Sequence, residues 1–291
     1  MQNIRGLILD MDGVLWRAHQ PLGDLPTLFA RLDAMGVRSV FVTNNATRSV
    51  AQYVEKLRAL GVEVSAERIL NSAQAAAHFL RSAVPAGAAV YVLGEEGLVQ
   101  TLKSAGFRIV NETQTEAQAA PASANTNQDN QREVAAVVVA LDRHGTYAKL
   151  REAALLVRRG ALFVGTNPDR TYPTPEGLVP GAGALIAALE AATDQKAHIV
   201  GKPQPLLFQM ALERLGTRPE ETLVVGDRLE TDIAGGQAAG CRTAVVLSGV
   251  TTREQAMQWR PSPDLIAPDF TAVVDFLARE RTWQGTRVVT R

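Results

Sequence analysis

The sequence has a single cysteine, no surplus of either charge and no long apolar run, and each shortage excludes a class of protein. With one cysteine, Cys241, the chain cannot form an internal disulfide, which fits a reducing cytoplasm. Its 30 basic and 30 acidic residues cancel, so no basic surplus indicates nucleic-acid binding. No apolar run approaches the roughly 18 residues of a membrane span, and the short apolar stretch after Gly6 is not a signal peptide. We therefore expect a cytoplasmic protein whose partners include neither nucleic acid nor a membrane.

What the chain does have is an alternation of strand-like and helix-like segments. Helices are predicted at Thr27–Met35, Val50–Leu60 and Gln204–Leu215, and each is followed by a glycine, which is a helix-stop signal. This alternation predicts an α/β fold with parallel sheets and crossover helices. The chain of 291 residues is long enough for two domains. The apolar runs that predict strands are Leu7–Leu9, Val37–Val42, Ala88–Leu93, Val134–Ala140, Ala161–Val164, His198–Val200, Thr222–Val225 and Thr243–Leu247.

Two aspartates, Asp10 and Asp12, directly follow the first of these predicted strands. Carboxylates at the end of a buried strand are costly unless they are used, and ligands of open α/β sheets bind at the carboxyl ends of the strands. Residues i and i+2 of an extended segment point to the same side, so both carboxylates can face one site. One can then attack a substrate while the other moves a proton, provided that a cation offsets their repulsion.

Polar residues that suit a phosphate group follow two further predicted strands. Thr43 and Asn44 come after Val37–Val42, where a hydroxyl and backbone N–H groups can donate to an oxyanion. The same residues also make a good turn or helix cap. Lys202 comes just after His198–Val200 and can neutralise a nucleophile and a phosphoryl group, although most lysines are simply solvated.

A second acidic pair, Asp227 and Asp232, follows the strand Thr222–Val225. Its oxygens suit a hard cation such as Mg²⁺, whereas the simpler interpretation makes Asp232 a helix-start residue favoured by the dipole. Together with Asp10, Asp12 and the polar residues above, the pair completes the parts that phosphoryl transfer needs, because that chemistry depends on positioning and charge stabilisation.

In this order the motifs resemble those of the haloacid dehalogenase (HAD) superfamily of phosphatases. The resemblance is closest to the subfamily IIA branch that contains the NagD-like, para-nitrophenylphosphatase, pyridoxal phosphate and phosphoglycolate phosphatases. The segment from Gly165 to Gly183 further suggests this branch. The motifs are Asp10-Met-Asp12-Gly-Val-Leu, Thr43-Asn44-Asn45, Gly201-Lys202-Pro203 and Gly226-Asp227-Arg228-x-x-Thr-Asp232.

The resemblance implies a Rossmann-like, doubly wound parallel-sheet core with an inserted α/β cap domain. The core would comprise residues 1–77 and 181–278, and the cap residues 78–180. Residues 111–132 hold almost no large apolar side chain and are expected to form a flexible loop within the cap. The last residues, 279–291, are expected to be a polar tail.

The resemblance also implies roles for the four acids. Asp10 would be the nucleophile that becomes an aspartyl phosphate, and Asp12 the general acid and base. Mg²⁺ would be held by Asp10, Asp227 and the main-chain carbonyl of Asp12, with Asp232 as the second acid of the metal motif, behind the direct ligands. The dehalogenases lack the second aspartate, so Asp12 favours phosphate monoesters as substrates.

Further roles concern the substrate. Thr43 and Asn44 match the phosphate-binding position, and Lys202 matches the lysine that steadies the phosphate. Arg143 and His144 lie in a segment that resembles the substrate-specificity loop of the cap and are candidates to meet the distal end of the substrate, although a solvated arginine and a surface histidine are the simpler interpretation. Tyr147, at a helix start, is expected in the core.

The predicted function is Mg²⁺-dependent hydrolysis of small phosphorylated metabolites through an aspartyl-phosphate intermediate. Two alternatives stay open at this point: a phosphotransferase that passes the phosphoryl group to an alcohol, and a non-catalytic regulator that binds a phospholigand. The sequence does not specify the ester, and a homodimer is open as well.

Overall fold

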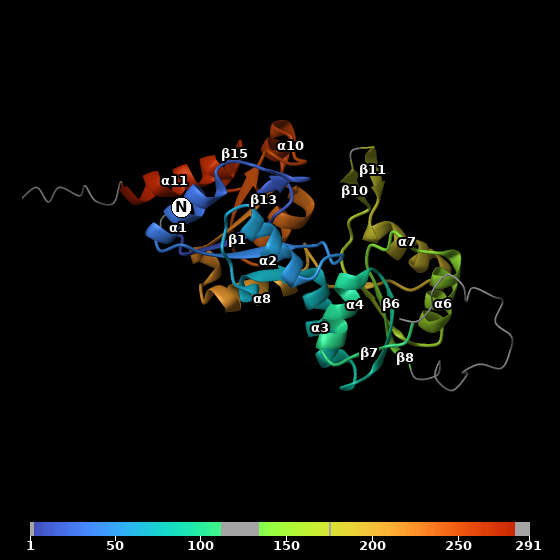
Figure 1. Ribbon diagram of the computed structural model, residues 1–291. Helices are drawn as coiled ribbons and strands as arrows, with labels where there is room; N and C mark the ends of the chain where they lie inside the picture. Colours follow the sequence, from blue (N-terminus) through green and yellow to red (C-terminus); the bar gives the residue numbers. More distant parts are fainter. Residues whose placement is uncertain (1–2, 112–133, 175, 283–291) are drawn as a thin grey trace, which may run out of the picture. The chain divides into compact units, whose positions relative to one another are not determined.

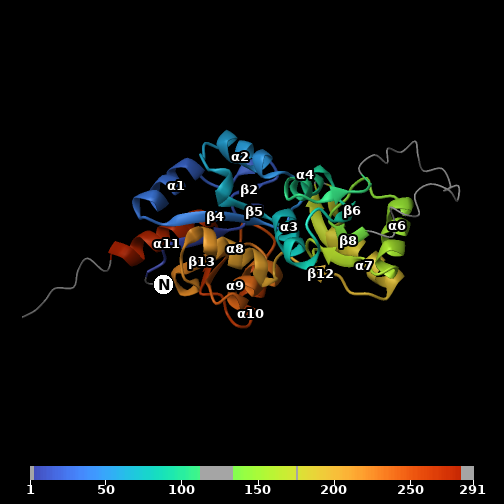
Figure 2. The same ribbon diagram turned by 90° about the horizontal axis from the view of Figure 1, so that it is seen from below.

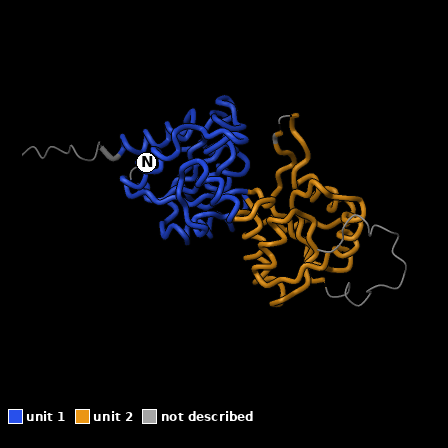
Figure 3. The backbone as a smooth tube through the Cα atoms, in the orientation of Figure 1, with its two compact units in different colours: residues 1–43, 51–70, 202–291 blue, residues 44–50, 71–201 orange. Residues whose placement is uncertain are grey.

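The computed structural model describes residues 3–111, 134–174 and 176–282, which form two compact units (Figure 3). The first unit contains residues 1–43, 51–70 and 202–291, and the second contains residues 44–50 and 71–201. The chain thus changes unit after Thr43, Val50, Leu70 and Gly201. Each unit is built around its own sheet.

The first unit contains a six-stranded sheet in the order β15-β14-β13-β1-β4-β5. Chain order runs outward from β1 in both directions, and the pairings from β15 through β4 are parallel, so the sheet is doubly wound. Strands β1 and β13 are buried along their whole length, as expected when helices cover both faces. The strands are β1 (Gly6–Leu9), β4 (Arg38–Thr43), β5 (Ile69–Asn71), β13 (Thr222–Gly226), β14 (Arg242–Val246) and β15 (Leu265–Ala267).

Helices lie on both sides of this sheet, with α1 and α2 on one side and α8 and α9 on the other (Figure 2). The glycines expected to end three of them, Gly36, Gly61 and Gly216, adopt positive φ angles of 65°, 77° and 59°. A small hairpin, β2 (Trp16–Arg17) with β3 (Gln20–Pro21), follows β1. The helices are α1 (Leu25–Ala34), α2 (Val50–Ala59), α8 (Pro205–Leu215), α9 (Ala234–Ala238), α10 (Arg253–Gln258) and α11 (Phe270–Thr282).

The second unit contains a five-stranded sheet in the order β12-β9-β8-β6-β7, and all of its pairings are parallel. Helices α3 and α4 lie on one side of it and α6 and α7 on the other (Figure 1). Its buried core includes Tyr91, Val137, Phe163 and Ile186. The elements are α3 (Ser72–Ala83), β6 (Ala89–Leu93), α4 (Glu96–Ser104), β7 (Arg108–Ile109), β8 (Val134–Val139), α6 (Tyr147–Arg158), β9 (Leu162–Gly165), the hairpin β10 (Thr171–Thr174) and β11 (Gly177–Pro180), α7 (Ala182–Thr193) and β12 (His198–Ile199).

The expected α/β architecture is confirmed, and each of the eight predicted strands has its counterpart. The main segment of the second unit runs from residue 71 to residue 201, whereas the cap was expected at residues 78–180. It is longer because α3 packs against α4 and α7 packs against α6 within the second unit. The expected tail was placed too early, since α11 continues to Thr282. The expected flexible loop lies outside the described residues except for Asn111. In the part of the chain that the structure describes, no helix is long and apolar enough to span a membrane.

Candidate active site

Three strand ends of the first sheet meet at one edge, because β1 pairs with both β4 and β13 in parallel. Asp10 directly follows β1, and its backbone N–H donates to the carbonyl of Val225 at 2.9 Å. Thr43 is the last residue of β4 and is buried, and Asp227 directly follows β13. The sheet therefore brings together side chains that lie far apart in the sequence, as the motif positions predict.

Lys202 connects the acids of this edge. It does not end a strand of the first sheet, because β12 pairs with β9 in the second sheet and Lys202 precedes α8 instead. Its Nζ atom donates to Asp10 Oδ1 and to Asp232 Oδ1, both at 2.6 Å, and to the carbonyl of Val42 at 3.2 Å. Only 3% of Lys202 is exposed. The solvated-lysine alternative is therefore wrong.

Burial and charge act in opposite directions on Lys202. Burial disfavours the ammonium form, but the adjoining carboxylates of Asp10 and Asp232 outweigh it and hold the pKa of Lys202 above its ordinary value. The lysine is therefore a fixed positive charge between two acids. A buried charge of this kind is tolerated only when it is paired and hydrogen-bonded.

The acids themselves form a group with the chemistry of a cation site. One carboxylate oxygen each from Asp10, Asp227 and Asp232 lie within 4.8 Å of one another. Burial raises the pKa of Asp10 well above its usual value against the pull of Lys202, and the charges of Asp232 and Asp227 raise it further. Burial, followed by the charge of Asp232, raises the pKa of Asp227 to about 7. Crowded, buried oxygens that resist ionisation fit a divalent cation, which would relieve their repulsion.

The carboxylate of Asp227 is held in place by backbone on two sides. A Cβ atom at Gly13 or at Gly249 would collide with it, so only glycine fits at either position. The backbone N–H of Val250 donates to Asp227 Oδ2 at 2.9 Å, and the Thr251 hydroxyl donates to the Asp227 carbonyl at 2.7 Å. Sequence reasoning missed this support from residues 249–251, because no motif spacing connects them to Asp227.

Asp232 is buried and lies in a π-helical turn, Leu229–Ile233, that leads into α9. Its Oδ2 atom accepts from the backbone N–H of Arg228 at 3.1 Å, and its Oδ1 atom accepts from Lys202. The contact of Oδ2 with the Arg228 N–H agrees with the helix-start interpretation. The Oδ1 atom, in contrast, binds Lys202.

Asp12 is exposed, in contrast to the other acids. Its Oδ1 atom accepts from the indole Nε1–H of Trp16 at 2.7 Å. Its carboxylate is not part of the cation group formed by Asp10, Asp227 and Asp232. The expected contribution of Asp12 to a metal site, through its main-chain carbonyl, stays a prediction.

Asn44 follows Thr43 in the chain and belongs to the second unit. Its side-chain amide donates to Asp169 Oδ2 at 3.2 Å. Its carbonyl accepts from the Ser72 hydroxyl at 2.6 Å and from the Asn167 amide at 2.8 Å. The side chain therefore makes a hydrogen bond within the second unit, and the expected role of Asn44 in phosphate binding stays a prediction.

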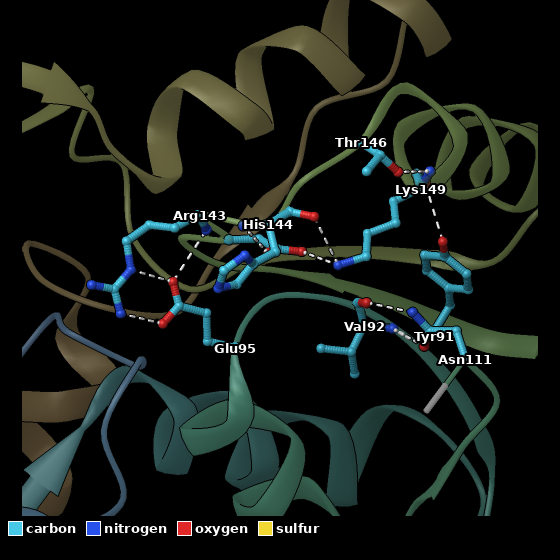
Figure 4. A network of polar contacts seen from close by, with 9 residues as sticks. Tyr91, Val92, Glu95, Asn111, Arg143, His144, Thr146 and Lys149 are labelled. Carbon is cyan, nitrogen blue, oxygen red and sulfur yellow. Dashed lines mark hydrogen bonds and ion pairs between the residues drawn. The ribbon is translucent and has the colours of Figure 1, made fainter. Parts of the chain in front are cut away.

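The candidate specificity loop is held together by a polar network (Figure 4). Arg143 donates through Nε and one terminal nitrogen to the two oxygens of Glu95, at 2.7 and 2.6 Å. The Arg143 side chain is 59% exposed and that of Glu95 only 12%. Burial alone would raise the pKa of Glu95, but hydrogen bonds from Arg143 outweigh it and lower that pKa. Arg143 is therefore exposed to solvent, as the simpler interpretation expects, and it is also paired with Glu95. Its contact with a substrate stays a prediction.

The remainder of the loop is shaped by Asp142 and Lys149. Lys149 Nζ donates to Asp142 Oδ2 at 2.9 Å and to the carbonyl of His144 at 3.1 Å, while Asp142 Oδ1 accepts from the backbone N–H of His144 at 2.9 Å. His144 is exposed. The expectation that Tyr147 lies in the core is wrong, since it is 82% exposed at the start of α6.

Cys241 is a free, buried thiol. Burial, followed by the charge of Glu220, raises the pKa of Cys241 to about 12. A thiol in this state has little nucleophilic thiolate.

Comparisons with known proteins agree with this geometry. Two family models match the chain: haloacid dehalogenase-like hydrolase over residues 7–108, and HAD-hydrolase-like over residues 199–273. A glycerol-3-phosphate phosphatase of Gallus gallus is 39% identical over 93% of this chain and 89% of its own length. The solved p-nitrophenyl phosphatase of Archaeoglobus fulgidus has a TM-score of 0.82 and 32% identity, over 94% of this chain and 99% of its own.

A third relative was solved with a metal ion. The glycerol phosphate phosphatase of Mycobacterium tuberculosis in complex with magnesium has a TM-score of 0.79 and 36% identity, over 94% of this chain and 77% of its own. The same protein was also solved in complex with calcium. With its fold, its strand-end acids and these relatives in agreement, this chain belongs to the haloacid dehalogenase-like hydrolases, in the branch of the NagD-like and para-nitrophenyl phosphatases.

Proposed function

We propose that this chain hydrolyses small phosphate monoesters with Asp10 as the nucleophile. The observation that carries the proposal is the position of Lys202 Nζ, 2.6 Å from both Asp10 and Asp232, at the edge where Asp227 and Thr43 also lie. This arrangement combines an attacking carboxylate, a fixed cation and acidic ligands on rigid strand ends. Such an arrangement suits phosphoryl transfer, where positioning and charge stabilisation supply most of the catalysis.

In the first half of the reaction, a carboxylate oxygen of Asp10 forms a bond to phosphorus while the bond to the ester oxygen breaks. Lys202 favours the ionised form of Asp10 and stabilises negative charge on the transferring group. Asp12 gives a proton to the departing ester oxygen, so the alcohol leaves neutral. In the second half, Asp12 takes a proton from water as the water oxygen bonds to phosphorus, and phosphate leaves Asp10.

The group of three aspartates supports Mg²⁺ as the cofactor, with Asp10 and Asp227 as its carboxylate ligands and Asp232 behind them on Lys202. When bound there, the ion supplies positive charge that offsets the crowded carboxylates and the phosphate oxygens. The magnesium complex of the mycobacterial relative supports this choice.

Phosphate binding is assigned to the Thr43 hydroxyl and the backbone N–H of Asn44, together with Lys202. We take the second unit as the cap domain, which excludes water and reads the leaving group through the loop of Arg143 and His144. The names of the relatives suggest glycerol 3-phosphate and phosphoglycolate as the first esters to assay. The single cysteine, free and buried, supports a cytoplasmic location.

The test is phosphate release from a panel of metabolite esters and p-nitrophenyl phosphate, with Mg²⁺, for the wild type and Asp10→Asn. We expect the wild type to turn over at least one metabolite and the variant to lose that turnover. Equal turnover by both proteins would sink the mechanism. Adding alcohols to the assay separates hydrolysis from phosphotransfer, because a transferase would form new esters. Binding without turnover by the wild type would favour a regulator instead.

A further inference from the structure

Trp16 contacts the candidate proton donor Asp12, and the mechanism above gives it no role. It is fully buried, and its indole Nε1–H donates to Asp12 Oδ1 at 2.7 Å. We propose that Trp16 is a positioning residue for Asp12, and that it directs the proton that Asp12 transfers to the Oδ2 atom. This inference rests on the proposed phosphatase function.

A tight turn places the two side chains together. The backbone N–H of Gly13 donates to the Trp16 carbonyl at 2.7 Å, that of Leu15 donates to the Met11 carbonyl at 2.9 Å, and Asp12 and Trp16 form an isolated β-bridge. Gly13 has a φ of 83°, which side chains other than glycine rarely adopt. The backbone of this turn therefore fixes the distance between the main chains of Asp12 and Trp16.

The indole ring is itself held in one orientation. Trp16 pairs with Pro21 in the β2–β3 hairpin. Lys56 Nζ, from α2, lies 3.8 Å from the ring centroid and also donates to the carbonyl of Ala18 at 3.3 Å. A cation over the face of a tryptophan is attracted by the ring, which opposes rotation away from it. The N–H group is consequently a fixed donor aimed at Asp12.

A fixed donor determines which oxygen of Asp12 can carry the proton. Indole nitrogen only donates, so the oxygen that it contacts must accept. When Asp12 is protonated, the proton is therefore favoured on Oδ2, because Oδ1 as the carbonyl oxygen is the stronger acceptor for Trp16. As the ester bond breaks, the proton moves from Oδ2 to the alcohol oxygen. When water attacks phosphorus, Oδ2 takes the proton of that water. Without the indole N–H, either oxygen can carry the proton and the carboxyl group can rotate.

The test compares two esters that differ in their need for a proton. p-Nitrophenolate is a stable anion and leaves without protonation, whereas the alkoxide of glycerol 3-phosphate needs a proton from Asp12. We expect Trp16→Phe, which keeps an aromatic ring but lacks the N–H, to lower kcat/KM for glycerol 3-phosphate about tenfold more than for p-nitrophenyl phosphate. That is part of the roughly 10²–10⁴-fold that a positioned acid supplies. Asp12→Asn should likewise lower kcat/KM more for glycerol 3-phosphate than for p-nitrophenyl phosphate.

Two further variants make the result specific. Trp16→Phe added to Asp12→Asn should not change the ratio of the two esters further, because both variants remove the same proton donor. Trp259→Phe is a matched control, since Trp259 Nε1 donates to Gln237 Oε1 at 3.3 Å and not to a candidate site residue. We expect the control to leave the ratio unchanged.

Equal losses on both esters, or a further change of ratio in the double variant, would overturn the assignment of Trp16. If Trp16→Phe does not fold, benzothienylalanine at position 16 replaces the N–H by sulfur at nearly constant shape and should give the same bias. Failure of the wild type to hydrolyse either ester or any other member of the panel would instead contradict the proposed function.

Discussion

Lys202 Nζ lies 2.6 Å from Asp10 Oδ1, although the two residues are 192 positions apart in the sequence. The contact joins the end of β1 to the loop before α8, and the same ammonium group also holds Asp232. Because the pair is buried, each charge depends on the other for stability as well as for reactivity.

Replacement of Lys202 by methionine therefore has two expected effects. Turnover should fall at least about 10²-fold, because a fixed charge that stabilises the transferring group is lost. Stability in the absence of Mg²⁺ should fall by about 3–5 kcal/mol, since the adjoining carboxylates lose their cation. Activity assays and thermal melts in a chelator measure both effects. Lys196→Met, at an exposed surface pair with Glu190, is the control and should change neither. Turnover of Lys202→Met within twofold of the wild type would contradict this role.

Asp227→Asn should abolish the stabilisation of the protein by Mg²⁺. A ligand present at 100 times its Kd stabilises the folded state by about 2.7 kcal/mol, and the variant loses a carboxylate of the site that would confer this. In a chelator the variant should be at least as stable as the wild type, because it removes a buried carboxylate whose pKa is raised by burial and then by the charge of Asp232. Thermal melts with and without Mg²⁺ test both statements. Asp275→Asn, in a surface pair with Arg31, is the control and should keep the full stabilisation by Mg²⁺. Loss of this stabilisation in Asp275→Asn, or its retention in Asp227→Asn, would contradict the proposed site.

The Arg143–Glu95 pair should affect substrate choice more than stability. Arg143→Met should raise KM for phosphoglycolate, which has a second anionic group, by roughly tenfold and more than for glycerol 3-phosphate, because a charged hydrogen-bond donor is lost. Glu95→Gln should have the opposite effect, since it releases the guanidinium. Melting should change less than substrate choice, because the guanidinium of the pair is exposed and screened by solvent, although the Glu95 side chain is only 12% exposed. Equal changes in KM for both esters would show that Arg143 does not read the distal group.

Cys241 should resist alkylation in the folded protein at neutral pH. Burial raises its pKa to about 12, so very little of the thiol is ionised at neutral pH. Thiolate is the reactive form, so labelling should be slow until the pH approaches 12 or the chain unfolds. Mass spectrometry after iodoacetamide treatment, with and without denaturant, measures this. Rapid labelling of the native protein would show that the thiol is accessible and ionised.

The sequence predicted the elements that carry strong local signals. Apolar runs such as Leu7–Leu9 and Thr222–Val225 mark buried parallel strands, and the residues that follow them mark the site. Short or exposed strands escaped prediction, because β5 and β15 each have three residues and the hairpin β10–β11 contains prolines and exposed positions.

Contacts between distant residues that belong to no recognised motif were beyond sequence reasoning. The placement of β12 in the second sheet depends on its pairing with β9, which no local pattern encodes. The support of Asp227 by Gly249 and Val250 and the pairing of Arg143 with Glu95 likewise join segments without a shared motif. Tyr147 was expected in the core at a helix start, but it occupies an exposed position in the first turn of α6.

The central claim is that Asp10 becomes covalently phosphorylated, and trapping that intermediate tests it most directly. Enzyme quenched with acid during turnover and then treated with borohydride should contain homoserine at position 10, because borohydride reduces an acyl phosphate and leaves a free carboxylate intact. Peptide mass spectrometry locates the change, and enzyme quenched without substrate is the control. The account predicts homoserine at position 10 only in the sample with substrate. Homoserine at another carboxylate, or none at position 10 during sustained turnover, would contradict it.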